Sequence, residues 1–562
     1  MQRFSQFRFG LWRLSFVLVI IFASMAAPAA PLQNADAANP PGRVVLVLPF
    51  NNRSGQADLA WIGESFPDTL NQRLNSAGFL TISRDDRQYA LDHLGLPTDF
   101  RPTHATTIRI AQTLDANYVI VGSYNVSQGR ISVQAQVLDV GNLAMTPPLE
   151  DSSELQRLFD VQNAIAWKIA RQIDPRFSVA QQTFLAAPGQ VKLTSFENYI
   201  RGISASTPQE RTKRLQLAVA ESPTYAAALL ALGKAQYTER DYDHAAITLA
   251  RVPTSDRRVL EANFYLGLAR FNSGRYADAE KAFAFVATRL PLPEVINNQA
   301  VASSRQGHNA TALFARAVAA DPNDADYHYN LAVSLYRQGD FSRAQTEINE
   351  VLRLRPKDNE APELKALIAF GRPPAPIVPP VPKPGLSPAS TTRPAGTPTQ
   401  SANVFEPLER IRRTYSEASF RQAAFQLDQM RAARMATLPP AEQAVQYVQL
   451  GHDYMAQGLV PEAEQQFQSA LTANPSSSDA HVGLAEVREL SGDAPSARTE
   501  AQAALKLRPT ASAYLVLARL DLHDNQNQSC AANVAQALKL EPKNTAALGM
   551  KQALAARGQS LP

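Results

Sequence analysis

Residues 444–477 read AVQYVQLGHDYMAQGLVPEAEQQFQSALTANPSS, and this stretch decides the fold of most of the chain. Its apolar residues recur at helical spacing. Gly451 stands at position 8 of the stretch and Phe467 at position 24. Pro475, at position 32, is expected to end a second helix, because proline lacks an N–H and clashes with the preceding turn. The stretch therefore predicts a helical hairpin.

The same pattern recurs on both sides of this stretch. Small residues at positions 8, 20 and 27 let two helices approach closely, and a bulky residue at position 24 fills the gap between them. Such a hairpin cannot bury its apolar face alone, so neighbouring hairpins must stack. Pro475, Pro509 and Pro542 follow one another at intervals of 34 and 33 residues. Earlier repeats are marked by Leu232-Gly233, Leu266-Gly267, Leu331-Ala332, Pro223, Pro291, Pro322 and Pro356.

This pattern resembles the tetratricopeptide repeat (TPR) family over roughly 300 residues. The resemblance implies two all-α solenoid arrays, over residues 196–370 and 404–557. Unpatterned helices at about 358–370 and 545–557 are expected to cap their ends. A helical segment from 407 to 435 is expected to open the second array.

A proline-rich stretch separates the two arrays. Residues 371–403 contain PPAPIVPPVPKPG and then a run of Ser, Thr, Pro and Ala. This composition cannot form a core and favours extended conformations, so we expect a semi-rigid linker. The alternative is a docking site for a proline-binding partner.

An α/β domain is predicted over residues 43–174. The apolar run at 43–50 indicates a buried strand, and the alternation at 131–138 indicates a strand that pairs with 118–124 as a hairpin. Another strand is expected at 79–83, with helices at 58–76, 106–114 and 154–173.

Four segments of this domain resemble the TolB amino-terminal-like (FlgO-like) family. They are VLVLPFNN at 45–52 with Ser54-Gly55, AQTLDANYVIVGS at 111–123, QAQVLD at 134–139 and FDVQ at 159–162. The chain departs from the family pattern around residues 85–104, where DFRP at 99–102 looks like a local insertion. The resemblance implies an interaction module of the cell envelope and provides no catalytic residue.

The N-terminus has the layout of a secretory signal peptide. Arg3, Arg8 and Arg13 precede the apolar run LSFVLVIIFASMAA at 14–27, and small residues follow. A run of this length is short for a membrane span. We therefore expect a signal peptide and spacer over residues 1–37 and a periplasmic or secreted protein. The alternative is an anchor in the inner membrane.

Composition argues against several other functions. Loss of a leader with three arginines would bring the formal net charge of +4 near +1, which does not favour nucleic-acid binding. The single cysteine, Cys530, stands at position 20 of a repeat and is expected to be buried. No phosphate-binding loop, nucleophile elbow or HExxH motif occurs in the sequence. His328 and His481 occupy a packing position of their repeats. We therefore expect no catalytic residues, no cofactor and no metal.

What remains is a peptide-binding groove on each array. Residues at positions 2, 5, 9 and 12 usually face the concave side of such a superhelix, where aromatic side chains suit an extended or helical peptide. The alternative is that they pack against neighbouring helices. The candidates in the first array are Lys234, Tyr237, Phe264, Phe271, Tyr329, Val333 and Tyr336. Those in the second array are His452, Met455, Glu486, Glu489 and Arg519.

These observations predict a non-enzymatic, exported scaffold that binds other proteins or peptides in the bacterial envelope. Two alternatives stay open. One is a regulatory protein that senses a ligand through its α/β domain. The other is an assembly factor for an outer-membrane or secretion complex.

Overall fold

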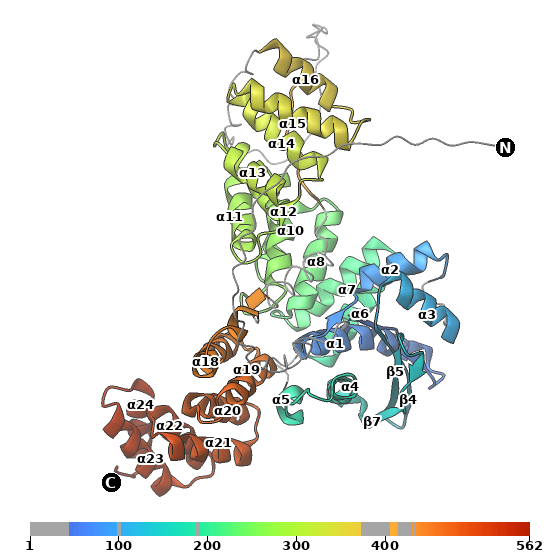
Figure 1. Cartoon of the computed structure of the whole chain (residues 1–562). Helices are drawn as coiled ribbons and strands as arrows, with labels where there is room; N and C mark the ends of the chain where they lie inside the picture. The colour runs from blue at the N-terminus through green and yellow to red at the C-terminus, as the bar shows by residue number, and fades with distance from the viewer. Residues whose placement is uncertain (1–43, 98–102, 187–190, 372–404, 414–429, 432) are drawn as a thin grey trace, which may run out of the picture. The chain divides into compact units, whose positions relative to one another are not determined.

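The computed structural model describes residues 44–97, 103–186, 191–371, 405–413, 430–431 and 433–562 (Figure 1). The predicted signal peptide lies outside these residues, and so does the linker from residue 372 on. No helix within the described residues is long and apolar enough to cross a membrane.

The first part is a mixed sheet covered by helices. Its path runs β3-β1-β4-β5-β6, with β2 paired to β4 and β7 paired to β5. β1 is parallel to β3 and β4, whereas β4 and β5 form an antiparallel hairpin whose turn contains Gly129 at φ 73°. The strands are β1 (Val44–Val47), β2 (Asn51–Asn52), β3 (Leu80–Thr81), β4 (Tyr118–Ser127), β5 (Arg130–Asp139), β6 (Ala144–Met145) and β7 (Leu149–Glu154).

Both faces of this sheet are buried, as the continuous apolar run of β1 requires. Val45 and Val47 pack with α1 and α4 on one face, whereas Leu46 and Leu48 pack with α2 and α3 on the other. Ser83 caps α2 by accepting a hydrogen bond from the backbone N–H of Asp86. The helices are α1 (Trp61–Ser76), α2 (Arg84–His93), α3 (His104–Thr113), α4 (Leu158–Ile173) and the short α5 (Gln181–Leu185).

The first helical array, array 1, follows directly. Its core is continuous with that of the sheet, because Phe196 on α6 packs edge-on against Trp61 and also contacts Phe159. Its helices are α6 (Leu193–Ile203), α7 (Pro208–Glu221), α8 (Ala226–Thr238), α9 (Tyr242–Leu249), α10 (Val259–Asn272), α11 (Tyr276–Ala287), α12 (Pro293–Ser304), α13 (Thr311–Ala320), α14 (Ala325–Arg337), α15 (Phe341–Leu354) and α16 (Ala361–Phe370).

The second helical array, array 2, has the same hairpin construction. Phe467 is fully buried, and its ring lies where a Cβ on Gly451 or Gly483 would stand. Its helices are α18 (Pro440–Ala456), α19 (Val460–Ala473), α20 (Ser478–Leu490), α21 (Ala494–Leu507), α22 (Ala511–His523), α23 (Asn527–Leu540) and α24 (Thr545–Ala556). Cys530 is buried in this array.

The structure corrects one expectation. Residues 405–413 do not form the start of a helix; they have no regular secondary structure and lie against array 1. Pro407 suits a first helical turn, and Leu408 and Ile411 have helical spacing, but contacts with array 1 override this local preference.

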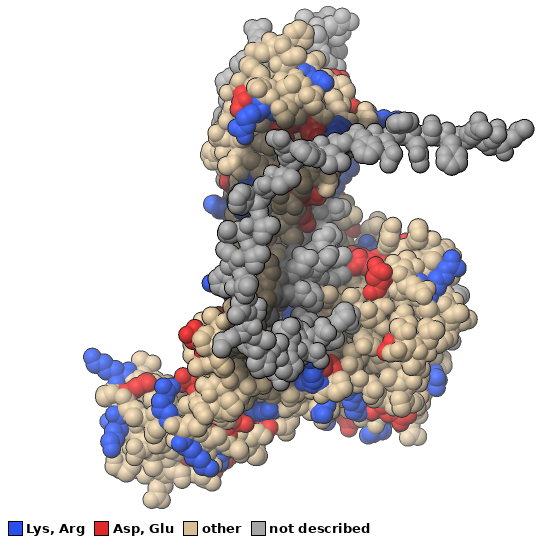
Figure 2. Space-filling view, in the orientation of Figure 1, with Lys and Arg blue, Asp and Glu red and all other residues tan. Residues whose placement is uncertain are grey.

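On the face drawn in Figure 2, acidic and basic side chains are interspersed, and neither sign forms one continuous field. The described residues visible on that face therefore form no broad basic surface of the kind that nucleic-acid binding would need.

Candidate functional site

Residues 405–413, with the sequence FEPLERIRR, are held by α12, α14 and the turn between α15 and α16. We call this part of array 1 the docking face and residues 405–413 the docked segment. The docked segment is not one of the repeats of array 1, which end with α16. Its contacts therefore show which groups this face can bind.

Asparagine side chains hold the backbone of the docked segment. Asn330 accepts a hydrogen bond from the N–H of Arg410 at 2.6 Å and donates one to its carbonyl oxygen at 2.8 Å. Asn298 does the same for Arg412, with both distances at 2.8 Å. Pairing of every second residue indicates an extended chain, because successive residues of such a chain face opposite sides.

A third asparagine supports this pair. Asn297 donates to the carbonyl oxygen of Arg410 at 3.1 Å and accepts from the side chain of Asn330 at 2.7 Å. Asn297, Asn298 and Asn330 are fully buried. A buried amide without hydrogen-bond partners costs about 1–3 kcal/mol. The backbone of the docked segment provides such partners to these side chains.

Carboxylates surround the guanidinium of Arg410. Asp358 accepts two hydrogen bonds from it, at 2.7 and 2.8 Å, and Asp326 and Glu360 accept others. The guanidinium also stacks on the ring of Tyr329, 3.7 Å from its centroid. Hydrogen bonding from Arg410 is the main reason that the pKa of Asp358 lies well below its usual range.

The side chain of Glu409 points to the opposite, basic edge of the docking face. Its carboxylate is fully buried and bonds to Arg337 and Ser304, with Arg305 at 3.6 Å. Arg337 also donates to the carbonyl oxygen of Pro407 at 2.8 Å. A buried carboxylate must be paired in this way to offset the loss of its hydration.

The remaining contacts complete an alternating pattern. Ile411 packs against two apolar clusters of array 1, the same two that Phe271 packs against. Arg412 pairs with Asp324 and Asp326 near the ring of Tyr327. The docked segment thus presents an acidic, a basic, an apolar and a basic side chain in order.

The predicted residues of the first array have different surroundings. Tyr329 contacts the docked segment directly, and Phe271 packs in the same apolar clusters as Ile411. Val333 and Tyr336 are buried in the cluster that Phe405 and Ile411 join. Three others contact neighbouring helices: Phe264 packs against Phe283, Tyr237 against Tyr242 and Tyr265, and Lys234 pairs with Glu261.

The predicted residues of the second array mostly contact one another or the core. His452 packs edge-on against Phe467, and Met455 lies beside the same cluster. Arg519 donates two hydrogen bonds to Glu489, both at 2.7 Å. Burial raises the pKa of Glu486.

The three asparagines were missed by the sequence reasoning. Asn330 is next to the predicted Tyr329, at position 6 of its repeat, whereas positions 2, 5, 9 and 12 were considered. Asn298 stands at the equivalent place in the preceding repeat. The signal in the sequence is an asparagine at the same position in the first helix of two successive repeats.

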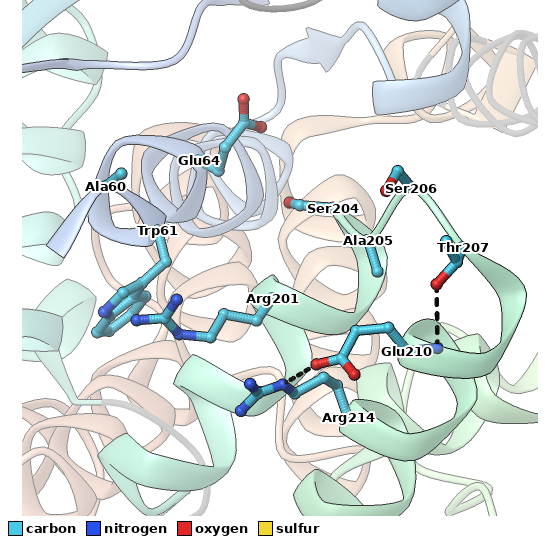
Figure 3. Close-up of a pocket in the computed structure, with 10 residues that line it drawn as sticks. All are labelled: Ala60, Trp61, Glu64, Arg201, Ser204, Ala205, Ser206, Thr207, Glu210 and Arg214. Carbon is cyan, nitrogen blue, oxygen red and sulfur yellow. Dashed lines mark hydrogen bonds and ion pairs between the residues drawn. The ribbon is translucent and has the colours of Figure 1, made fainter. Parts of the chain in front are cut away.

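A depression separate from the docking face lies where α1 meets α6 and α7 (Figure 3). Its volume is about 490 Å³, and Trp61, Glu64, Arg201 and Arg214 are among the residues that line it. The charged groups are already paired: Glu64 with Arg84 and Arg87, Arg201 with Glu197, and Arg214 with Glu210. The two arginines pair within their own helices and Glu64 pairs with α2, so each of these charges already has a partner within the protein.

The described residues contain no cluster of three or more His, Cys, Asp or Glu side chains that could hold a metal. His328 pairs with Glu347 and with the carbonyl oxygen of Pro322, and His481 pairs with Glu500. Both histidines therefore already have partners within the protein.

These contacts define a helical repeat protein that holds an extended segment against α12, α14 and the turn between α15 and α16. The tetratricopeptide repeat model matches residues 302–368, which include most of the docking face, and residues 448–512 in array 2. The chain therefore contains tetratricopeptide repeats, and proteins built from such repeats are generally non-enzymatic scaffolds for protein–protein interaction.

The comparisons with solved structures give partial matches. The C-terminal domain of LpoB from Escherichia coli is 25% identical, with 20% of this chain and 83% of that chain covered and a TM-score of 0.18. The MamA RS-1 ArsTM double mutant is 19% identical over 32% of this chain and 99% of that chain, with a TM-score of 0.27. YrrB, a TPR protein with an unusual peptide-binding site, is 13% identical over 36% and 98%, with a TM-score of 0.27. No curated protein matches the chain.

Proposed function

We propose that this protein is an exported scaffold of the bacterial cell envelope that holds extended segments of other proteins on the docking face of array 1. The observation that carries the proposal is the pairing of Asn298 and Asn330 with the backbone of residues 410 and 412. Contacts of this kind give affinity for any extended chain, whereas the surrounding charges select among chains.

The envelope location rests on the signal-peptide layout of residues 1–37. The TolB amino-terminal-like resemblance of the α/β domain supports the same compartment. In this proposal the α/β domain and array 2 contact further partners, and no catalytic step is assigned to any part of the chain.

Photo-crosslinking in cells tests this function. A photoreactive residue replaces Phe271, which packs against the same apolar clusters as Ile411, or Ile247, which is 63% exposed on α9. We expect the position 271 probe to capture envelope proteins that the position 247 probe does not, and we expect the protein in the periplasmic fraction. Cytoplasmic fractionation would contradict the location. Identical captures at both positions would contradict the docking face.

The same experiment separates the alternatives. A ligand-sensing regulator would give no protein captured specifically at position 271. An assembly factor would give components of one membrane complex.

A further inference from the structure

The docking face is asymmetric in charge, and this asymmetry specifies a ligand. Asp324 and Asp326 lie at the start of α14, and Asp358 and Glu360 just before α16. Arg305 and Arg337 lie at the ends of α12 and α14. Acidic groups near helix N-termini and basic groups near C-termini suit the helix dipoles, so the helices arrange one acidic and one basic edge.

An extended chain between these edges must alternate its own charges. A carboxylate is required toward Arg305 and Arg337, and a cation toward the acidic edge, because successive side chains point to opposite sides. Asp358 accepts two hydrogen bonds from the guanidinium of Arg410, and the face of the same guanidinium stacks on the ring of Tyr329. This geometry fits the planar guanidinium of arginine and not the ammonium of lysine.

We propose that the docking face recognises partner segments with the order acidic, Arg, apolar, Arg in extended conformation, and that residues 405–413 are a tethered competitor which such a partner must displace. This inference rests on the proposed function and names the chemistry of its ligand. Glu409, Arg410, Ile411 and Arg412 are the internal copy of that order.

Tethering has a consequence for affinity. A segment on the same chain competes at an effective concentration of about 1 mM, so an external peptide of equal intrinsic affinity binds poorly while the internal segment is docked. The competitor thereby excludes weak ligands and admits partners that match the pattern better or present several copies of it.

Binding of a labelled FEPLERIRR peptide to the full chain tests both parts. We expect weak binding to the unmodified protein and at least about tenfold tighter binding to the Arg410→Glu variant, whose own segment is repelled by the acidic edge. Arg413→Glu is the matched control. This variant makes the same charge change at a position next to the paired residues. Arg413 itself has no ion pair or hydrogen bond among the described residues, so binding should stay weak.

Two further arms complete the test. Adding Asn298→Ala and Asn330→Ala to the Arg410→Glu variant should abolish binding, and circular dichroism would verify that the helices remain. A peptide with glutamate in place of both paired arginines should fail to bind the Arg410→Glu protein. A peptide with lysine at the first of these positions should bind more weakly than the arginine peptide.

The outcomes separate the inference from the proposed function. If the Arg410→Glu variant binds FEPLERIRR no better than the unmodified protein or the Arg413→Glu control, the competitor is overturned. If the glutamate peptide binds equally well, the recognition order is overturned. In either case specific envelope captures at position 271 would leave the scaffold intact. Absence of those captures would remove the scaffold as well.

Discussion

Asn330 contacts the backbone of the docked segment directly, as donor and as acceptor. We expect Asn330→Ala to weaken peptide binding to the Arg410→Glu protein by about 1–3 kcal/mol, because the substitution removes two hydrogen bonds from a buried site. Isothermal titration calorimetry measures this change.

Asn263 provides the control for that substitution. Its side chain bonds only within its own helix, to the carbonyl oxygen of Val259, among the contacts of the described residues. Asn263→Ala should leave the peptide affinity unchanged. Equal losses for the two variants would mean that Asn330 acts on the stability of the array and not on the ligand.

His328 gives array 1 a pH dependence. Hydrogen bonding to Glu347, opposed by burial, raises the pKa of His328 above the ordinary value of 6.5. A group with a raised folded pKa stabilises the fold fully below its unfolded pKa and loses that contribution as pH rises through the folded pKa. The protonated ring can donate from both nitrogens, to Glu347 and to the carbonyl oxygen of Pro322.

We therefore expect His328→Gln to destabilise the protein more at about pH 5.5 than at about pH 9. Urea unfolding at the two pH values measures the difference. His523, whose side chain is 86% exposed, is the control, and His523→Gln should show little dependence on pH. A larger loss for His328→Gln at the higher pH would reverse the assigned sign.

Within one hairpin, the glycine at position 8 makes room for the bulky residue at position 24. A Cβ on Gly451 would stand 2.5 Å from the ring of Phe467, and one on Gly483 would stand 2.3 Å from it. Because the ring is enclosed on both sides and fully buried, it cannot move away from one glycine without approaching the other.

Gly451→Ala should consequently lower the free energy of unfolding of array 2 by about 1–3 kcal/mol. Gly549 in α24 is the matched control, since a Cβ there meets no atom within 4 Å. Gly549→Ala should be neutral or stabilising by about 0.5–1 kcal/mol, because alanine favours a helix. Thermal unfolding of both variants measures this contrast, and equal effects would contradict the packing account.

The same spacing explains what the sequence could predict. Positions 8 and 24 act within one hairpin, so their pattern is visible locally, and the helices of both arrays were predicted on that basis. The polar edge strand β7 was not predicted, because Leu149–Glu154 alternates intermediate and exposed residues and lacks an apolar face. The sequence predicts a helix at the docked segment because the residues of array 1 that hold it extended are distant in the sequence.

The site was predictable only in part, for a related reason. The sequence predicts Tyr329 and Phe271 as aromatic residues at groove positions. Tyr329 contacts Arg410 of the docked segment, and Phe271 packs against the same apolar clusters as Ile411. The acidic edge combines residues near two helix starts, and no local pattern distinguishes Asp358 from an ordinary turn residue. The role of these groups emerges only when Arg410 lies among them.

At the scale of the whole molecule, the predicted end of the α/β domain at residue 174 divides a continuous core. Phe177, Phe184 and Phe196 belong to the same apolar cluster as the sheet residues Val45 and Val47. We expect the fragment 43–174 to melt at a lower temperature than the fragment 43–204, because the shorter fragment exposes the surface that these rings cover. Scanning calorimetry compares them, and equal melting temperatures would contradict a shared core.

Residue-resolved hydrogen exchange at residues 405–413 of the full chain tests the central claim most directly. The account predicts that the amides of Arg410 and Arg412, which donate to Asn330 and Asn298, exchange slowly. Neighbouring amides should exchange faster, and Asn298→Ala with Asn330→Ala should abolish the alternation. Uniformly fast exchange across residues 405–413 in the unmodified protein would show that the segment is not docked and would contradict the account.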